Sequence, residues 1–172
     1  AIDGLVVKTG WQTIDGKKYY YKEDGTQATY WYKVDGNYYW FGTDGIMKTY
    51  WQKVYNKYYW LGSDGAMRTG WQTVYGKKYY LGKANDGAMK TGWQTVDGKK
   101  YYLGNASDGA MKTGWQTIDG KKYYLGNDGA MKTYWQSVDG KYYWFGTDGV
   151  MKTYWQKVYN KYYWLGSDGV MR

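Results

Sequence analysis

The sequence predicts an all-β fold, a solenoid of about eight stacked β-hairpins, with one hairpin in each repeat of about 20 residues. Three observations support this fold. A segment led by Trp recurs at intervals of 20 or 22 residues, each copy holds two short runs of strand-forming residues, and a turn signal separates those runs. Residues 1–172 are therefore expected to form a single repeat array. The leading tryptophans are Trp11, Trp31, Trp51, Trp71, Trp93, Trp115, Trp135 and Trp155.

The first element of each repeat is the hairpin, represented by residues 71–82, WQTVYGKKYYLG. Its two halves are rich in β-branched and aromatic residues, which favour strands. Five of the eight copies place Asp-Gly between the halves, as at Asp119-Gly120. Asp-Gly suits a type I′ turn because both central residues need positive φ. The other three copies have Tyr-Asn or Tyr-Gly there, which keeps a turn-permissive second residue.

The second element is a connector with its own Asp-Gly, followed by a small or β-branched residue and then Met. All seven Met residues occupy this place, and Gln27 takes it in the first repeat. Because Met fills irregular gaps, we expect these side chains to pack between stacked hairpins rather than to bind a ligand. The chain begins with AIDGLVVKTG and ends with SDGVMR, two forms of the same connector, which predicts a segment of a larger protein.

The composition excludes most catalytic and metal chemistry. The chain has no Cys and no His, so Ser-His-Asp and Cys-His triads cannot form. All fourteen Asp residues precede Gly and are explained by turns, which leaves only Glu23 as a further carboxylate. We therefore expect a protein that is not an enzyme, with no cofactor and no metal site.

The net charge of +9 arises from lysines placed regularly in the repeats. It serves solubility or attracts polyanions such as wall teichoic acids. No nucleic-acid-binding motif occurs, so nucleic acid is not an expected partner. No apolar stretch reaches the length of a membrane span, and no signal peptide is visible. The sequence does not indicate an oligomeric state.

The repeats are of two types when residues are numbered from the leading Trp as position 1. Lys-type repeats have Lys at position 8, Tyr at position 10 and Gly before the Trp. Tyr-type repeats have Tyr at position 8, Trp at position 10 and Tyr before the leading Trp. Positions 8 and 10 face the same side of a strand, and position 1 lies near them on the partner strand. Each repeat is thus expected to present an aromatic cluster on one face, used either as a cross-strand ladder or for binding.

The strings GWQTIDGKKYYLG and DGAMKTGW resemble the cell-wall-binding repeat family across essentially the whole chain. This family includes choline-binding, glucan-binding and clostridial toxin receptor-binding repeats. The resemblance implies stacked hairpins with ligands held between them, in a secreted, non-catalytic protein of the bacterial cell surface. It also implies choline cages made from positions 1 and 8 of one hairpin and an aromatic residue of the next. The expected cages are Trp31, Tyr38 with Trp60; Trp51, Tyr58 with Tyr80; and Trp135, Tyr142 with Trp164.

Lys-type repeats depart from the cage pattern, because the ammonium of Lys18, Lys78, Lys100 or Lys122 would occupy or repel a cation site. They are more similar to glucan-binding and toxin repeats, and Trp71, Trp93 and Trp115 are their candidate sugar-stacking residues. The sequence therefore favours attachment to a cell-wall or extracellular polysaccharide, such as a wall glycan or glucan, through several sites. One alternative is recognition of choline-decorated teichoic acid. A second alternative is a structural spacer that binds nothing.

Overall fold

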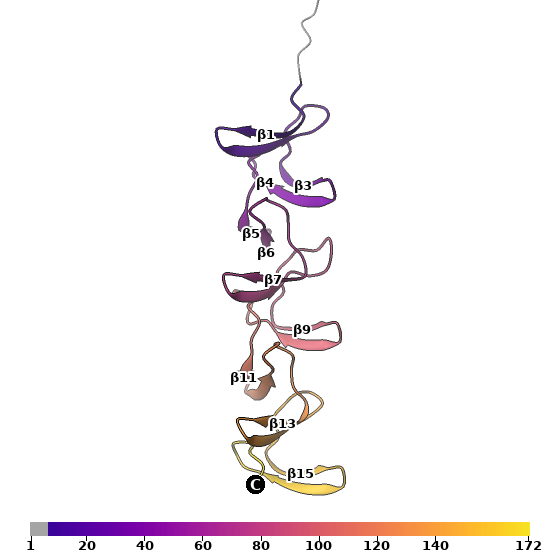
Figure 1. Cartoon of the computed structure of the whole chain (residues 1–172), viewed down its shortest axis with the longest axis vertical. Coiled ribbons are helices and arrows are strands. Elements are labelled where there is room, and N and C mark those ends of the chain that lie inside the picture. The colour runs from indigo at the N-terminus through magenta and orange to yellow at the C-terminus, as the bar shows by residue number, and fades with distance from the viewer. Residues whose placement is uncertain (1–6) are drawn as a thin grey trace, which may run out of the picture. The chain divides into compact units, whose positions relative to one another are not determined.

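The computed structural model describes residues 7–172 and contains paired strands with no helix in this range (Figure 1). Its contacts divide the chain into two compact units, residues 1–90 and 91–172. The expected connector sequence at residues 1–6 lies outside the described residues. No helix that could span a membrane occurs in the described part of the chain.

Each unit contains four antiparallel hairpins, and each hairpin is a separate two-stranded sheet. The strands of the first unit are β1 (Gly10–Ile14), β2 (Lys17–Tyr21), β3 (Tyr30–Val34), β4 (Asn37–Phe41), β5 (Tyr50–Val54), β6 (Lys57–Leu61), β7 (Trp71–Val74) and β8 (Lys77–Tyr80). Those of the second unit are β9 (Trp93–Val96), β10 (Lys99–Tyr102), β11 (Gly114–Ile118), β12 (Lys121–Leu125), β13 (Tyr134–Val138), β14 (Lys141–Phe145), β15 (Tyr154–Val158) and β16 (Lys161–Leu165). The predicted all-β array of eight hairpins is confirmed.

The hairpin turns have the predicted left-handed backbone. Asp119 and Gly120 have φ values of 50° and 74°, and the Tyr55-Asn56 turn has values of 48° and 64°. Two consecutive positive φ values define a type I′ turn, whose twist matches that of the flanking strands. The turn therefore fixes the pairing of positions 1 and 10, as in Trp115 with Tyr124.

The core of each unit consists of apolar side chains from both the hairpins and the connectors. Position 11 supplies its largest fully buried residues, Phe41, Leu61, Leu81, Leu103, Leu125, Phe145 and Leu165. Position 4 adds a buried Val or Ile from most hairpins, and the connectors add buried Ala. Since no single hairpin can enclose these side chains, stacking provides most of the apolar burial.

Connector methionines join consecutive hairpins, as the sequence predicts. The N–H of Met67 donates to the carbonyl oxygen of Tyr38 in the preceding hairpin, at 2.8 Å. Its sulfur packs against Gly87 of the next connector so closely that a Cβ at that glycine would lie 2.3 Å from it. The same contact joins Met47 to Gly65 and Met131 to Gly149. Met therefore fills the gap between repeats, and the connector Gly makes room for it.

The connector aspartates hold their turns through side-chain hydrogen bonds. Asp64 accepts hydrogen bonds from the N–H of Ala66 and from the guanidinium of Arg68, each at 3.0 Å. Partial burial opposes ionisation of Asp64, but these two donors outweigh it and lower its pKa. At Asp168 the hydrogen bond from Arg172 is the main cause of a pKa of about 2.

These lowered pKa values predict a loss of stability in acid. A carboxyl group whose pKa is lower in the folded state stabilises that state above its unfolded pKa of about 4, and the contribution disappears as the pH falls through the folded value. We expect the melting temperature to fall between pH about 4 and pH about 2, as measured by circular dichroism. Asp168→Asn should weaken the dependence at the acid end, whereas a melting temperature constant down to pH about 2 would contradict the prediction.

Candidate functional site

Strand pairing gathers the aromatic residues of one hairpin on a single face. In the β3–β4 hairpin, Trp31 pairs with Trp40 and Lys33 pairs with Tyr38. Positions 1, 3, 8 and 10 therefore lie on the same face, because side chains alternate along each strand. Position 9 lies on the opposite face, where Tyr39 pairs with Tyr32. Each hairpin thus has two aromatic faces.

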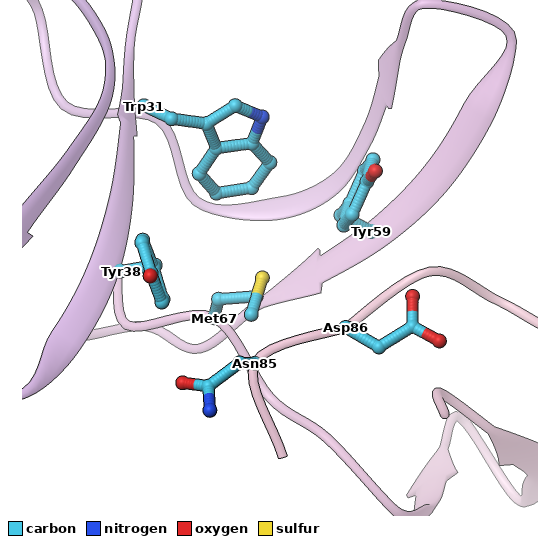
Figure 2. Close-up of a pocket in the computed structure, with 6 residues that line it drawn as sticks. All are labelled: Trp31, Tyr38, Tyr59, Met67, Asn85 and Asp86. Carbon is cyan, nitrogen blue, oxygen red and sulfur yellow. The ribbon is translucent and has the colours of Figure 1, made fainter. Parts of the chain in front are cut away.

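The two faces of consecutive hairpins meet at a pocket of about 290 Å³. Trp31 and Tyr38 come from the β3–β4 hairpin, Tyr59 comes from β6, and Met67 comes from the following connector. Figure 2 shows Tyr38 and Tyr59 on either side of the pocket, with the indole of Trp31 across from Met67. The ring centroids of Trp31 and Tyr59 lie 4.9 Å apart at an interplanar angle of 66°. Three rings and a thioether therefore surround one space.

The ring that completes this pocket is at position 9 of the next hairpin, whereas the expected closing residues Trp60, Tyr80 and Trp164 are at position 10. Trp60 packs on Trp51 of its own hairpin at 5.4 Å, Tyr80 on Trp71 at 5.1 Å, and Trp164 on Trp155 at 5.4 Å. The reason is alternation: the face carrying positions 1, 8 and 10 points toward the following hairpin, so only the opposite face can point back. The rings of the next hairpin that contact Trp31, Trp51 and Trp135 are thus Tyr59, Tyr79 and Tyr163.

A third repeat also reaches the pocket. Asn85 and Asp86, from the connector that follows β8, line it together with the residues of the two hairpins (Figure 2). Burial and then the charge of Asp86 raise the pKa of Tyr59 above its ordinary value. The carboxylate of Asp86 is itself paired with Lys90 at 2.7 Å. The sequence assigns every Asp to a turn and every Met to packing alone, so it predicts neither Asp86 nor Met67 in the lining of this pocket.

The same contact between the leading Trp and the next hairpin occurs in the Tyr-type repeats of Trp51 and Trp135. Trp51 lies 5.0 Å from Tyr79, and Trp135 lies 5.0 Å from Tyr163. The connector Met again donates its N–H to the carbonyl of position 8, from Met89 to Tyr58 at 2.8 Å and from Met171 to Tyr142 at 2.9 Å. Tyr38, Tyr58 and Tyr142 are therefore held in equivalent places by the same backbone bond.

In three Lys-type repeats the lysine at position 8 lies over the leading indole. The ammonium of Lys78 lies 5.0 Å from the ring of Trp71, that of Lys100 lies 5.7 Å from Trp93, and that of Lys122 lies 5.2 Å from Trp115. These distances are in the range of a cation–π contact. In two Tyr-type repeats the lysine at position 3 instead lies over the position-8 ring, with Lys33 5.0 Å from Tyr38 and Lys53 5.5 Å from Tyr58.

The first Lys-type site shows what such a pocket offers to a ligand. Trp11, Lys18, Tyr39, Met47 and Asp64 line a space of about 230 Å³. The arrangement matches that of the Tyr38 pocket, with an ammonium in place of the phenol ring. This pocket therefore combines aromatic surface with charged hydrogen-bonding groups of both signs.

Residues 8–50, 90–134 and 112–152 match the model of the choline-binding repeat, and residues 49–67, 69–89 and 153–171 match that of a cell wall binding repeat described as putative. No curated protein matches the sequence.

Solved structures with the same fold come from Streptococcus pneumoniae. CbpJ is 35% identical with a TM-score of 0.88, and choline binding protein F, solved in the presence of a peptidoglycan analogue, is 38% identical with a TM-score of 0.88. The match covers 96% of this chain and 58% of each of those chains. The choline-binding domain of CbpL is 28% identical with a TM-score of 0.65, and the match covers 96% of this chain and 87% of that one.

Proposed function

The chain belongs to the choline-binding repeat family, and from this membership we propose that its Tyr-type pockets bind the quaternary ammonium group of choline. The observation that carries the proposal is the pocket between the β3–β4 and β5–β6 hairpins. It presents the rings of Trp31, Tyr38 and Tyr59 around a space of about 290 Å³. The residues Trp51, Tyr58 and Tyr79, and Trp135, Tyr142 and Tyr163, form the two equivalent sites.

The chemistry of this pocket suits a trimethylammonium group. Such a group carries a positive charge but has no N–H to donate, so aromatic faces attract it by roughly 0.5–2 kcal/mol per ring. Met67 adds a polarisable thioether, and Asp86 adds a carboxylate that is paired with Lys90. The similarity to the choline-binding domain of CbpL agrees with this assignment.

The Lys-type repeats favour a second candidate, contact with carbohydrate. Lys18 and Asp64 at the Trp11 pocket could exchange hydrogen bonds with sugar hydroxyls while the indole stacks on the ring. The same role is proposed for Trp71, Trp93 and Trp115. A cation is disfavoured at these three, because a lysine ammonium already lies over each indole.

The repeated sites support attachment to a polymer rather than to a single small molecule. We place the chain at the bacterial cell surface as a secreted binding module, with choline-decorated teichoic acid or a wall glycan as its partner. The module contributes binding and no catalysis of its own. The matched pneumococcal chains extend beyond the region covered here, so any further activity would belong to other parts of such a protein.

Titration of Trp fluorescence tests the choline assignment. Choline should change the emission with a dissociation constant of about 1 mM, the value expected for a shallow site with few contacts. Ethanolamine is the matched control, because it keeps the hydroxyl and the charge but lacks the three methyl groups that fill the aromatic pocket. Equal responses to the two compounds, or a response only to polysaccharide, would overturn the choline assignment in favour of a general cation site or of glycan binding.

A further inference from the structure

A second aromatic surface occurs beside the pockets and shares none of the residues that line the pocket of Figure 2. We call it the tyrosine ledge. Each ledge consists of the Tyr before the leading Trp, the Trp at position 10, and the Tyr in the turn of the next hairpin. The three ledges are Tyr30, Trp40 and Tyr55; Tyr50, Trp60 and Tyr75; and Tyr134, Trp144 and Tyr159.

In each ledge the indole contacts both tyrosine rings. In the first, the Trp40 centroid lies 5.8 Å from Tyr30 and 6.3 Å from Tyr55. The turn tyrosines stand nearly perpendicular to the indoles, at 81° for Tyr55 on Trp40, 83° for Tyr75 on Trp60 and 79° for Tyr159 on Trp144. The indole and the turn phenol thus form two nearly perpendicular aromatic surfaces.

The turn residue changes together with position 10 of the preceding hairpin. Every hairpin that follows a Trp at position 10 has Tyr at the first turn position, namely Tyr55, Tyr75 and Tyr159. Every hairpin that follows a Tyr at position 10 has Asp there, namely Asp35, Asp97, Asp119 and Asp139. Residues 30–68 and 134–172 are close copies, but Tyr75 lies outside both copies and follows the same rule after Trp60. The indole and the turn Tyr therefore form one unit.

Stability does not account for the turn tyrosines. Tyr55, Tyr75 and Tyr159 have φ values of 48°, 49° and 48°, a left-handed conformation that Asp and Gly adopt more readily. Their side chains are 79–81% exposed, so they bury little apolar surface. Tyr30, Tyr50 and Tyr134 also have positive φ, where the Lys-type repeats have Gly. Six exposed tyrosines thus occupy backbone positions better suited to smaller residues.

We propose that each ledge is a stacking site for a pyranose ring of a neutral polysaccharide, separate from the cation pockets. A pyranose has an apolar face for the indole and hydroxyl groups at its edge. Tyr hydroxyls and the Trp N–H lie at the edges of the aromatic rings and can bond to them. The ledge residues include no charged and no aliphatic side chain, which disfavours an ionic ligand and a protein anchor. Repetition along the chain suits a polymer of sugar units.

The test replaces the turn tyrosines in the full chain by the residue that sibling hairpins use, as Tyr55→Asp, Tyr75→Asp and Tyr159→Asp. The probes are two neutral soluble glycans, dextran and hydroxyethyl cellulose, with affinity measured by gel retardation. We expect at least one of the two glycans to retard the parent, and the triple variant to bind that glycan at least about tenfold more weakly through lost multivalency. The melting temperature should not fall, and the choline response should stay unchanged.

A variant that gains a ledge tests the proposal without relying on a loss of glycan binding. Gly92→Tyr, Tyr102→Trp and Asp119→Tyr together would build a complete new ledge on the β9–β10 and β11–β12 hairpins, and Asp119→Tyr alone is the control. The triple gain variant should bind the glycan more tightly than the control does. A parent that neither glycan retards overturns the proposal. So does unchanged glycan binding by the triple aspartate variant, which would assign any glycan contact to the Lys-type tryptophans and leave the choline assignment intact.

Discussion

Replacing Tyr38, Tyr58 and Tyr142 by lysine is expected to abolish the choline-induced change in Trp fluorescence. Each substitution removes one ring of a pocket and brings an ammonium close to the remaining indole, as Lys100 does at 5.7 Å from Trp93. The fixed ammonium competes for the same aromatic face and repels a second cation. Loss of a ring and direct competition together predict at least about 100-fold weaker binding at each site.

The reverse substitution, from lysine to tyrosine at position 8, should create a choline site in a Lys-type repeat. Lys122→Tyr removes the ammonium that lies 5.2 Å from Trp115. The closing ring is already present, because Tyr143 lies 4.8 Å from Trp115. The backbone bond is present as well, since the N–H of Met151 donates to the carbonyl of residue 122 at 2.8 Å. We expect one additional choline per chain, counted by equilibrium dialysis. Full choline binding by the folded triple lysine variant would show that the cation does not enter these pockets.

The fold could be predicted closely because each of its determinants is local. The 20-residue period, the Asp-Gly turns and the alternation of residues around them specify a hairpin without reference to distant parts of the chain. The connector Met was also predictable, because a flexible apolar side chain at the same place in every repeat needs a gap to fill. Its contact with Gly87 is a consequence of that packing.

The candidate site was predictable only within one hairpin. Register places Trp31 and Tyr38 on the same face, and that follows from sequence spacing. Which residue of the next hairpin closes the pocket depends on which of its faces points back, a property of stacking. Tyr59 and Trp60 are adjacent and both aromatic, so composition could not separate them. The alternation rule, applied across the stack, would have favoured Tyr59.

Contributions from more distant repeats were harder to anticipate. Asp86 reaches the first Tyr-type pocket from the connector two repeats after Trp31, although its position beside Gly87 is fully explained by a turn. The turn tyrosines did carry a signal, namely their agreement with position 10 of the preceding repeat. This correlation is between two neighbouring hairpins, so it cannot be seen when each repeat is examined separately.

Multivalent attachment predicts that binding to a polymer depends steeply on the number of open pockets. Lysine substitutions close the pockets one at a time in the full chain, so that valency changes without truncation. The series Tyr38→Lys, then with Tyr58→Lys, then with Tyr142→Lys leaves successively fewer Tyr-type sites. Free choline should lose one bound molecule per substitution, while the affinity of each remaining pocket stays the same.

Retention on choline-decorated teichoic acid should instead fall by about 10- to 100-fold for each of the first two steps. Once one pocket is bound, tethering gives the next an effective choline concentration that can reach the millimolar range or above. Each closed pocket removes one such intramolecular step, and its loss multiplies the dissociation constant for the polymer. Surface plasmon resonance on immobilised teichoic acid measures this dependence, with Thr117→Lys as a control that adds the same charge outside the Tyr-type pockets. A decline proportional to the number of pockets would mean that they act independently, and anchoring would then rest on some other part of the surface.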